Sequence, residues 1–352
     1  MLSGPRLAID RALERFLASA HEQITAIDGE LTPISSALNE FLAGGKRLRP
    51  LFATAGFVGA GGSLDDESIY RACVCLELLQ ACALIHDDMM DGSDTRRGAP
   101  SMHRRFEREH SERRGFGDSE NFGHATALLL GDLALVWSTQ ALNLSGLSDL
   151  QLRSVNPIFD IMRVELMAGQ YLDMHGGSLD TMSIESAIKI ATYKSGKYTI
   201  ERPLHFGGVL AHPDENGALL AAYSEYGIPL GIAFQLRDDL LGVFGDSAIT
   251  GKPAGDDLLE GKRTALIAYA QKHLSEREHE EFATLFGKKN LTLDQIDRLR
   301  LLIKNTGAVD FIEKLIEEKT ILALTALQNS KISSSGRELL AELAIKATQR
   351  SA

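Results

Sequence analysis

Three aspartates, Asp87, Asp88 and Asp91, stand at the end of a long apolar stretch of the chain. The stretch has the pattern of a helix, and residues four apart lie on one helical face, so Asp87 and Asp91 point the same way. Two like charges at that spacing, at a helix C-terminus, destabilise the helix unless a cation neutralises them. Mg²⁺ prefers carboxylates together with waters and phosphates. Taken alone, the cluster is equally compatible with a solvated acidic surface patch.

A second acidic pair, Asp238 and Asp239, closes another apolar stretch, in the segment Phe-Gln-Leu-Arg-Asp-Asp that begins at Phe234. Two apolar helices that each end in paired aspartates suggest two acidic rims facing each other above an apolar cavity. Metal ions bridging the rims would hold a diphosphate whose tail enters the cavity. The second cluster therefore favours a metal site over a surface patch.

Local clusters of cations supply the positive charge that an acidic protein needs to bind a phosphate. Residues 44–50, Gly-Gly-Lys-Arg-Leu-Arg-Pro, set three cations beside a flexible glycine pair, which suits a phosphate grip. Arg96 and Arg97 follow the first acidic cluster. More cations stand near helix ends and glycine-rich turns, at Lys194, Lys197, Lys252, Lys262 and Arg263. Each alone is typical of a solvated side chain, so the argument rests on the set.

Helices must position these groups, because the sequence has no convincing run of alternating strand residues. We predict an all-α fold, a single domain over residues 1–352 built as a helical bundle. Helical patterns cover 6–27, 48–60, 67–91, 123–145, 149–173, 183–212, 217–244, 264–283, 293–303, 307–328 and 335–349. The polar stretch 104–122 is predicted to be an exposed loop, and 245–263 is predicted to be loop-like.

Composition excludes several classes of protein. The chain has 352 residues, 44% of them hydrophobic, and a formal net charge of −11, which argues against a nucleic-acid partner. Residues 1–30 lack the apolar run of a signal peptide, and no stretch reaches the ~18 apolar residues of a membrane span. The three cysteines, Cys73, Cys75 and Cys82, have the pattern of buried small side chains, which fits a reducing, cytoplasmic location.

Together, these residues resemble the trans-isoprenyl diphosphate synthases (polyprenyl synthetases), most closely those that make geranylgeranyl diphosphate. The resemblance runs from about Leu38 to about Thr264, with the motifs in the family's order. It rests on both aspartate-rich motifs, Arg96-Arg97-Gly98, the 44–50 segment, Gln80, Gln170 with Asp173, Lys194-Ser195, and Lys252, Asp257 and Lys262. It implies an all-α isoprenoid-synthase fold around a central apolar cavity. It also implies a Mg²⁺-dependent prenyltransferase, usually a homodimer, that condenses isopentenyl diphosphate with dimethylallyl, geranyl or farnesyl diphosphate and releases diphosphate.

The resemblance also assigns roles to individual positions. Isopentenyl diphosphate would be held by Lys46, Arg49, Gln80 and Arg97. The allylic diphosphate would be held by Arg96, Lys194 and Lys252, and Lys262 would also bind substrate. Three Mg²⁺ ions per site would be bound by Asp87, Asp91 and Asp238, with Asp88 and Asp239 in support. The reacting allylic carbon would be lined by Ser195 and Gln235, which with Lys194 and Lys252 form the catalytic set.

Two features depart from the family pattern. The family usually carries a third aspartate four residues after the first one of its second motif, and here that position is Gly242. Asp246, one turn further on, better suits a turn or capping role than metal binding. The polar stretch 106–121 is also longer than in many members. No protein nucleophile is expected, because the double bond of isopentenyl diphosphate attacks the allylic carbon. The released diphosphate can accept the proton, so His86 fits a structural role better than that of a base.

Other functions are weighed against this one. A class I terpene cyclase shares the fold type and an aspartate-rich motif, but it needs no second diphosphate site, for which residues 44–50 argue. A non-catalytic synthase subunit should have lost aspartates from the first motif, and all three are present. A purely structural helical scaffold would not explain acids and bases in the family's order.

We predict the product length from the helix that ends in the first acidic motif, along which the growing prenyl chain should descend. In the family, bulky aromatics four and five residues before the first aspartate give short products, and here those positions are the small Ala83 and Cys82. A C20 product, geranylgeranyl diphosphate, is therefore expected. Leu79 and Leu76 would lie deeper along the path of the growing prenyl chain, and Trp137 could form part of the cavity floor. A longer polyprenyl diphosphate is the alternative.

Overall fold

The computed structural model describes residues 2–214, 217–245, 255–328 and 331–348, and these residues are almost entirely helical, as predicted. The N-terminal half contains α1 (Ser3–Thr25), η1 (Gly29–Leu31), α2 (Thr32–Ala43), α3 (Leu48–Gly59), α4 (Glu67–Asp91), α5 (Met102–Glu112), α6 (Ser119–Asn143) and α7 (Asp149–Gly177). The C-terminal half contains α8 (Ile184–Ala191), η2 (Thr192–Glu201), α9 (Arg202–Ala211), α10 (Gly217–Phe244), α12 (Asp256–Glu260), α13 (Ala265–His273), α14 (Glu276–Leu285), α15 (Leu293–Asn305), α16 (Ala308–Gln328) and α17 (Ser334–Thr348). Two short strands after α4, β1 (Thr95–Arg96) and β2 (Ala99–Pro100), pair antiparallel.

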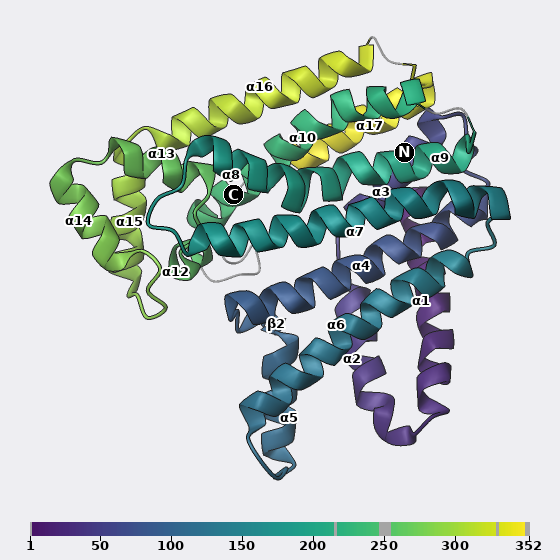
Figure 1. Cartoon of the computed structure of the whole chain (residues 1–352), viewed down its shortest axis with the longest axis horizontal. Coiled ribbons are helices and arrows are strands. Elements are labelled where there is room, and N and C mark those ends of the chain that lie inside the picture. The colour runs from purple at the N-terminus through teal and green to yellow at the C-terminus, as the bar shows by residue number, and fades with distance from the viewer. Residues whose placement is uncertain (1, 215–216, 246–254, 329–330, 349–352) are drawn as a thin grey trace.

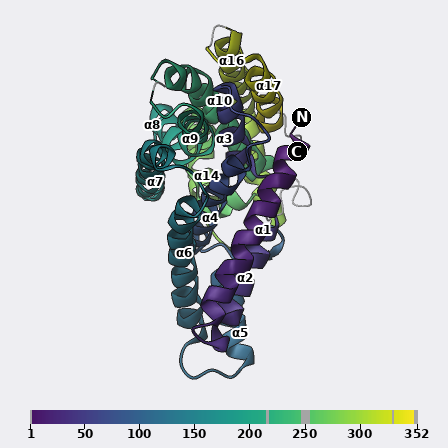
Figure 2. The ribbon, with the colours of Figure 1, turned by 90° about the vertical axis from the view of Figure 1, so that its right-hand side faces the viewer.

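The long helices α4, α7, α10 and α16 run across the molecule in Figure 1, with α13, α14 and α15 grouped at one end. Figure 2 shows the same body from the side, with α2, α5 and part of α6 extending below it. Packing is most extensive between α4 and α6, between α3 and α9, and equally between α10 and α16 and between α5 and α6. Buried apolar side chains form two clusters, a large one around α3, α4, α6 and α9 and a smaller one around α10, α13, α15 and α16.

Helix α4 carries the first acidic motif and is buried along most of its length. Its start is capped by Asp66, whose carboxylate accepts a hydrogen bond from the Ser68 N–H at 2.9 Å. Most of its interior side chains are apolar and buried, which is typical of a helix at the centre of a bundle. It ends at Gly92, whose φ of 66° is the left-handed conformation that glycine adopts readily. This end places Asp87 and Asp91 on the last two turns.

The segment η2 is a π-helix between α8 and α9, within the range 183–212 that the sequence predicted as one helix. It packs between α7 and α10, and its backbone touches α10 at Gly196 and Gly231. A Cβ added at Gly231 would lie 2.4 Å from the Gly196 Cα, so only glycine permits this approach. π-helical turns are frequent at functional sites because they shift the side chains that follow.

The prediction of an exposed loop over 104–122 holds only for residues 113–118, which are exposed and join two helices. Helix α5 covers 104–112 and packs on α6, with Phe106 only 4% exposed, and α6 begins at Ser119. Its charges pair along the helix, Arg105 with Glu109 at 3.1 Å and Arg108 with Glu112 at 3.7 Å, and such pairs stabilise a polar helix. The polarity that suggested a loop is one face of an amphipathic helix.

Two further boundaries differ from the prediction. The range 264–283 contains two helices, α13 and α14, because Ser275 caps a new helix through a capping box with Glu278. The described part of the predicted loop 245–263 contains the short helix α12. Asp246 and Lys252 lie outside the described residues, so their predicted roles are not tested.

Helices α4 and α6 are long and apolar enough, by length and composition alone, to cross a membrane. Core helices pass the same test, and the most apolar window of α4 is 72% buried inside the protein. The corresponding window of α6 is 44% buried, so this helix keeps an apolar face outside the core.

Candidate active site

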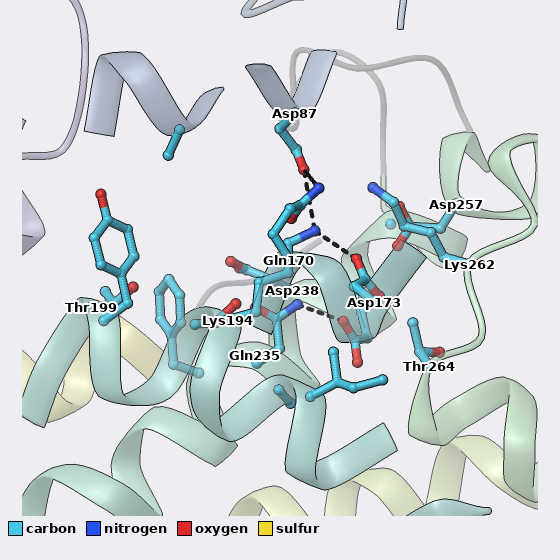
Figure 3. Close-up of a pocket in the computed structure, with 18 of the residues that line it drawn as sticks. Asp87, Gln170, Asp173, Lys194, Thr199, Gln235, Asp238, Asp257, Lys262 and Thr264 are labelled. Carbon is cyan, nitrogen blue, oxygen red and sulfur yellow. Dashed lines mark hydrogen bonds and ion pairs between the residues drawn. The ribbon is translucent and has the colours of Figure 1, made fainter. Parts of the chain in front are cut away.

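A cavity of about 550 Å³ opens between the C-terminal end of α4 and the helices α7, η2 and α10. Its mouth is lined by charged side chains from both acidic motifs and from the basic segments. Apolar side chains also line it, among them Ala83, Leu84, Leu166, Ile190 and Phe234. Figure 3 shows Asp87 on one side of this space and Gln235 and Asp238 on the other. The two rims predicted from the sequence therefore lie across one cavity.

The first rim is made by Asp87 and Asp91 on α4, and cations from other elements contact both. Lys194 Nζ lies 3.2 Å from Asp87 Oδ1 and 2.6 Å from Asp173 Oδ2 (Figure 3). Gln170 Nε2 donates to the same Asp87 oxygen at 3.0 Å. Lys262 Nζ lies 3.1 Å from Asp91 Oδ2. The rim is thus bridged to α7, η2 and the segment after α12.

Electrostatics keeps Asp87 ionised. Burial alone would raise its pKa, but Lys194, Lys262 and Arg96 outweigh burial and hold the pKa of Asp87 well below its usual range. Burial would likewise lower the pKa of Lys194, yet Asp87 and Asp173 raise it, so the ammonium remains protonated. The pKa of Asp91 is raised, because burial and the nearby Asp87 and Glu260 prevail over Lys262.

Asp88 points away from the cavity and supports Arg96. It is fully buried, and it accepts a hydrogen bond from Arg96 Nε at 2.8 Å. Arg96 in turn lies 3.7 Å from Asp87 Oδ2 and lines the cavity. Asp88 therefore holds a cation beside the first rim.

The second rim is made by Asp238 and Asp239 on α10. Gln235 Nε2 donates to Asp239 Oδ1 at 2.7 Å, one helical turn away. Burial raises the pKa of Asp239 well above its usual range, and Asp257, Asp238 and Asp173 raise it further by like-charge repulsion. This rim concentrates negative charge, which a divalent cation would neutralise.

The basic segment 44–50 joins α2 to α3 and divides its cations between two tasks. Arg47 is buried and bonds Asp10 at 2.8 Å and Glu77 at 2.6 Å, so it fixes the start of α3. Lys46 and Arg49 line the cavity instead. Arg49 donates to Thr199 Oγ1 at 2.8 Å and lies over the Tyr198 ring at 4.2 Å. These two contacts hold the guanidinium at the cavity wall, and a guanidinium is a group suited to binding phosphate.

Most of the predicted site residues meet at this cavity. Those that line it are Lys46, Arg49, Gln80, Asp87, Arg96, Lys194, Ser195, Gln235, Asp238, Asp239 and Lys262. Asp88, Asp91 and Arg97 do not line it; Arg97 donates to the backbone oxygens of Phe41 and Gly44, both at 3.2 Å. Lys252 falls among the residues that are not described.

The predicted site set left out several residues that shape the cavity. Tyr198 and Thr199 support Arg49, and the only signal for them is their helical spacing from Ser195. Gln170 and Asp173 hold Asp87 and Lys194; the Gly-Gln-x-x-Asp resemblance pointed to them without giving a role. Asp257 lines the cavity beside Lys262; the resemblance of the loop after the second motif pointed to it without giving a role.

Comparisons with known proteins agree with this geometry. A sequence model of the family described as Polyprenyl synthetase matches residues 32–302. A geranylgeranyl diphosphate synthase from Saccharolobus solfataricus is 30% identical over 85% of this chain and 84% of its own length. A geranylfarnesyl diphosphate synthase from Aeropyrum pernix is 30% identical over 79% of this chain and 81% of its own length.

A solved structure shows the same fold. The crystal structure of a geranylgeranyl pyrophosphate synthase from Corynebacterium glutamicum, complexed with isoprenyl diphosphate and magnesium, superposes with a TM-score of 0.94 at 41% identity and covers 99% of both chains. The matched family model spans both acidic rims and the basic segment at the cavity mouth. This chain belongs to the polyprenyl synthetase family.

Proposed function

We propose that this protein condenses isopentenyl diphosphate with an allylic diphosphate, in a Mg²⁺-dependent reaction that yields geranylgeranyl diphosphate and releases diphosphate. The observation that carries the proposal is the cavity itself. Two carboxylate rims and a ring of lysines and arginines stand at its mouth, and apolar side chains line its wall. A diphosphate headgroup with a hydrocarbon tail matches that division of polar and apolar surface.

The carboxylates suit Mg²⁺. This ion typically binds one or two protein carboxylates and completes its octahedron with waters and substrate phosphates. Among the described residues no three acidic, histidine or cysteine side chains form a metal-binding group by themselves, so phosphate oxygens would complete each coordination shell. We assign Asp87, Asp91 and Asp238 as ligands for three ions, supported by Asp88 and Asp239. When bound, Mg²⁺ would stabilise the negative charge of the leaving diphosphate.

The protein's own side chains would divide the two substrates between two sites. Arg96 and Lys194 would hold the allylic diphosphate beside the first rim, with Lys262 bridging toward α12. Lys252, which lies outside the described residues, keeps its predicted role in the same task. Lys46, Arg49, Gln80 and Arg97 hold isopentenyl diphosphate. Ser195 and Gln235 lie along the cavity wall, where the reacting carbon is placed.

The reaction needs no nucleophile from the protein. The allylic C–O bond breaks, and its electron pair leaves with the diphosphate, whose charge the surrounding cations stabilise. The double bond of isopentenyl diphosphate forms the new C–C bond to the allylic carbon. The neighbouring carbon loses a proton to the released diphosphate, which restores a double bond. The apolar wall keeps water from the intermediate cation.

Product length varies within this family, since two relatives that are equally identical to this chain are named for geranylgeranyl and geranylfarnesyl products. We propose the C20 product because Ala83, which lines the cavity, is small. A longer product is the second candidate. The test is incubation with isopentenyl diphosphate and dimethylallyl, geranyl or farnesyl diphosphate, with and without chelator, followed by chromatographic sizing. Absence of any Mg²⁺-dependent elongation would overturn the proposal.

We also propose that two copies pair through α6 and α7. Figure 2 shows these helices along the same side of the molecule. Their outer faces expose large apolar side chains, including Leu128, Leu129 and Val136 on α6 and Val164, Tyr171 and Met174 on α7. Exposed apolar surface of this kind on two neighbouring helices is typical of an interface. A homodimer would also cover the apolar face of α6 that the core leaves open.

The pairing has a direct test. Leu129→Glu with Val164→Glu should convert a dimer into a monomer in analytical ultracentrifugation, because both side chains are more than 60% exposed in the single chain. Ile321→Glu, at an exposed apolar position on α16, is the matched control and should leave the assembly unchanged. A wild-type protein that sediments as a monomer at micromolar concentration would contradict the proposal.

A cytoplasmic location completes the proposal. The three cysteines are free thiols buried in the apolar interior. Free thiols persist in reducing compartments.

A further inference from the structure

The π-helix η2 carries side chains that belong to both proposed substrate sites. Near its start, Lys194 lines the cavity and lies 3.2 Å from Asp87 Oδ1, on the side assigned to the allylic diphosphate. One turn further on, Thr199 accepts a hydrogen bond from Arg49 at 2.8 Å, on the side assigned to isopentenyl diphosphate. Any change in the winding of η2 would therefore move one substrate site relative to the other.

The winding of η2 also keeps its side chains on the cavity wall. Four cavity-lining positions of α8 and η2 recur at intervals of four residues, Ala187, Ala191, Ser195 and Thr199. On an α-helix of 3.6 residues per turn, each such step overshoots a full turn by about 40°. A π-helix takes more than four residues per turn and drifts in the opposite direction. An α-helix followed by a π-helix thus holds all four positions on one wall.

A ring of six polar side chains, which we call the Glu165 ring, holds η2 from outside the cavity. It joins four elements, and none of its members lines the cavity. Its two carboxylates and its histidine are each less than 10% exposed. The members are Glu165 of α7, Lys197 and Glu201 of η2, Arg202 and His205 of α9, and Ser224 of α10.

Glu165 is the member that binds η2 and α9 to α7. It accepts a hydrogen bond from Lys197 Nζ at 2.9 Å and two from the Arg202 guanidinium, at 2.6 and 2.7 Å. Burial alone would raise the pKa of Glu165, but Arg202 and Lys197 outweigh burial and lower it, so the carboxylate is ionised. Lys197 Nζ also lies 3.5 Å from Glu201 Oε2, one turn along η2.

The rest of the ring runs through a neutral histidine. Arg202 donates to His205 Nδ1 at 3.2 Å, and since arginine only donates, the histidine proton is assigned to Nε2. That nitrogen lies 3.0 Å from Ser224 Oγ, which in turn donates to Glu201 Oε1 at 2.6 Å and closes the ring. Burial lowers the pKa of His205, which agrees with the neutral form. Two carboxylates then balance two cations.

A ring of this kind specifies geometry more than it stabilises the fold. Buried ion pairs often contribute little net stability compared with apolar packing, whereas a member left without its partner is costly. The ring is also mechanically close to the site. One turn after Glu165, a Cβ added at Gly169 would lie 2.5 Å from the Lys194 backbone nitrogen, so α7 and η2 touch directly at the lysine of the allylic site.

We propose that the Glu165 ring is a positioning device that fixes the winding of η2 and thereby the placement of Lys194 relative to Arg49. The inference rests on the proposed function, because it concerns how the two substrates of that reaction are aligned. Condensation needs the two reacting carbons at near-attack distance, and a misplacement of about 1 Å costs on the order of 100-fold in rate. Glu165 touches neither substrate and acts through η2.

The kinetic test uses Glu165→Gln, which keeps the shape of the side chain and removes its charge. Its kcat should fall about 10–100-fold, while KM for each substrate changes much less, because each diphosphate keeps its own cations and only the alignment between them is lost. A rise in one KM with unchanged kcat would show that Glu165 serves a single substrate site, and would overturn the proposal.

Ser224→Ala is the independent arm, since it opens the ring on α10 with a small change of volume. It should lower kcat in the same way, and combining it with Glu165→Gln should add little further loss, because both changes break one network. This variant decides the question even if Glu165→Gln does not fold. Fully additive losses would mean that the two residues act separately, against a shared ring.

Hydrogen exchange of the substrate-free protein provides a readout that needs no turnover. The amides of residues 192–201 should exchange faster in Glu165→Gln than in wild type, whereas those of α15 should not change. Phe282→Leu, at a buried position of α14, is the control for lost stability. It should lower the melting temperature and leave both kcat well below that temperature and exchange in η2 unchanged.

The two measurements separate the inference from the proposed function. A wild-type protein that shows no elongation would remove the proposed function, and exchange would still decide whether the ring fixes η2. If Glu165→Gln only lowers the melting temperature, as Phe282→Leu does, with normal kcat and normal exchange in η2, the ring is merely structural and the inference fails alone.

Discussion

The two acidic rims look alike in sequence and differ in how the protein treats their charge. On the first rim, Lys194 and Arg96 approach Asp87, and Lys262 approaches Asp91. On the second rim, Asp239 accepts a hydrogen bond from Gln235, and burial, followed by the neighbouring carboxylates, raises its pKa. On the first rim the charge of Asp87 is compensated inside the protein, whereas the raised pKa of Asp91 and of Asp239 shows that these two carboxylates are ionised at a cost in electrostatic energy.

This difference indicates a division of labour. Cations of the protein order the first rim before any metal arrives, so α4, α7 and η2 are already in place around the cavity. On the second rim, the raised pKa of Asp239 disfavours its ionised form, which a bound divalent cation would stabilise. The two rims can therefore be distinguished experimentally, by measuring how variants in each change turnover, substrate affinity and the stability of the metal-free protein.

The largest expected effect follows loss of a first-rim carboxylate. Asp87→Ala or Asp91→Ala should lower turnover by roughly 10³-fold, since a metal ligand supplies several kcal/mol of transition-state stabilisation. Steady-state rates at saturating Mg²⁺ measure this loss, and circular dichroism checks the fold. Asp160→Ala, an exposed acid on α7, is the control. Near-normal turnover in either rim variant would remove the first rim from the metal site.

A smaller, selective effect is expected from the basic segment. Arg49→Ala should raise KM for isopentenyl diphosphate about 10–100-fold, and much less for the allylic primer, because charge-assisted contacts to a single diphosphate are lost. Arg47→Ala is the matched comparison two residues away. Since Arg47 bonds Glu77 and Asp10 within the protein, this variant should lower the melting temperature instead. Equal changes in both KM values for Arg49→Ala would mean that the two diphosphate sites are misassigned.

Product length probes the cavity below the rims. Ala83→Phe should shorten the product by one isoprene unit, because Ala83 lines the cavity and a ring there would fill the path of the tail. Cys82 is fully buried and does not line the cavity; its sulfur faces His86 Nδ1 at 3.8 Å. Cys82→Phe should therefore destabilise the protein rather than shorten the product. Chromatographic sizing and thermal melts separate these outcomes, and an unchanged product in an active Ala83→Phe enzyme would move the length limit elsewhere.

Sequence patterns predicted the rims well because each is local. Asp87 and Asp91, or Gln235 and Asp239, are one helical turn apart, and helical spacing alone orients them. The cations that neutralise them come from distant segments, as when Lys194 reaches Asp87 across 107 residues of chain, and periodicity contains no such information. Family resemblance supplied that list of residues, but not the contacts that divide Arg47 from Arg49.

The predictions from sequence that were wrong or incomplete also have specific physical causes. Helix α5 was predicted as a loop because its apolar anchor, Phe106, is surrounded by charges whose pairing is visible only on a helix. The π-helix η2 was hidden inside a helical pattern, because it depends on contact between Gly196 and Gly231 from two segments. The Glu165 ring likewise joins side chains of four elements that no spacing rule connects. In each case tertiary packing determined what local sequence left open.

The smallest effect should appear in the stability of the metal-free protein, with opposite signs for the two rims. The folded-state pKa of Asp87 is depressed, so its ionised form stabilises the fold above the unfolded pKa of about 3.9, and that contribution is lost only as pH falls through the lower folded value. The folded-state pKa of Asp239 is raised, so its ionisation costs stability as pH rises above about 3.9. In chelator at pH 7, Asp87→Asn should lower the melting temperature and Asp239→Asn should raise it, each by a few degrees. The side-chain amide introduced by Asp239→Asn would still accept the hydrogen bond from Gln235, so the gain would come from charge alone. Calorimetric melts between pH 4 and pH 8 should show two trends. The difference in melting temperature between Asp239→Asn and wild type should vanish near pH 4, whereas the difference between Asp87→Asn and wild type should persist. Shifts of the same sign in both variants would mean that the rims do not differ in charge compensation.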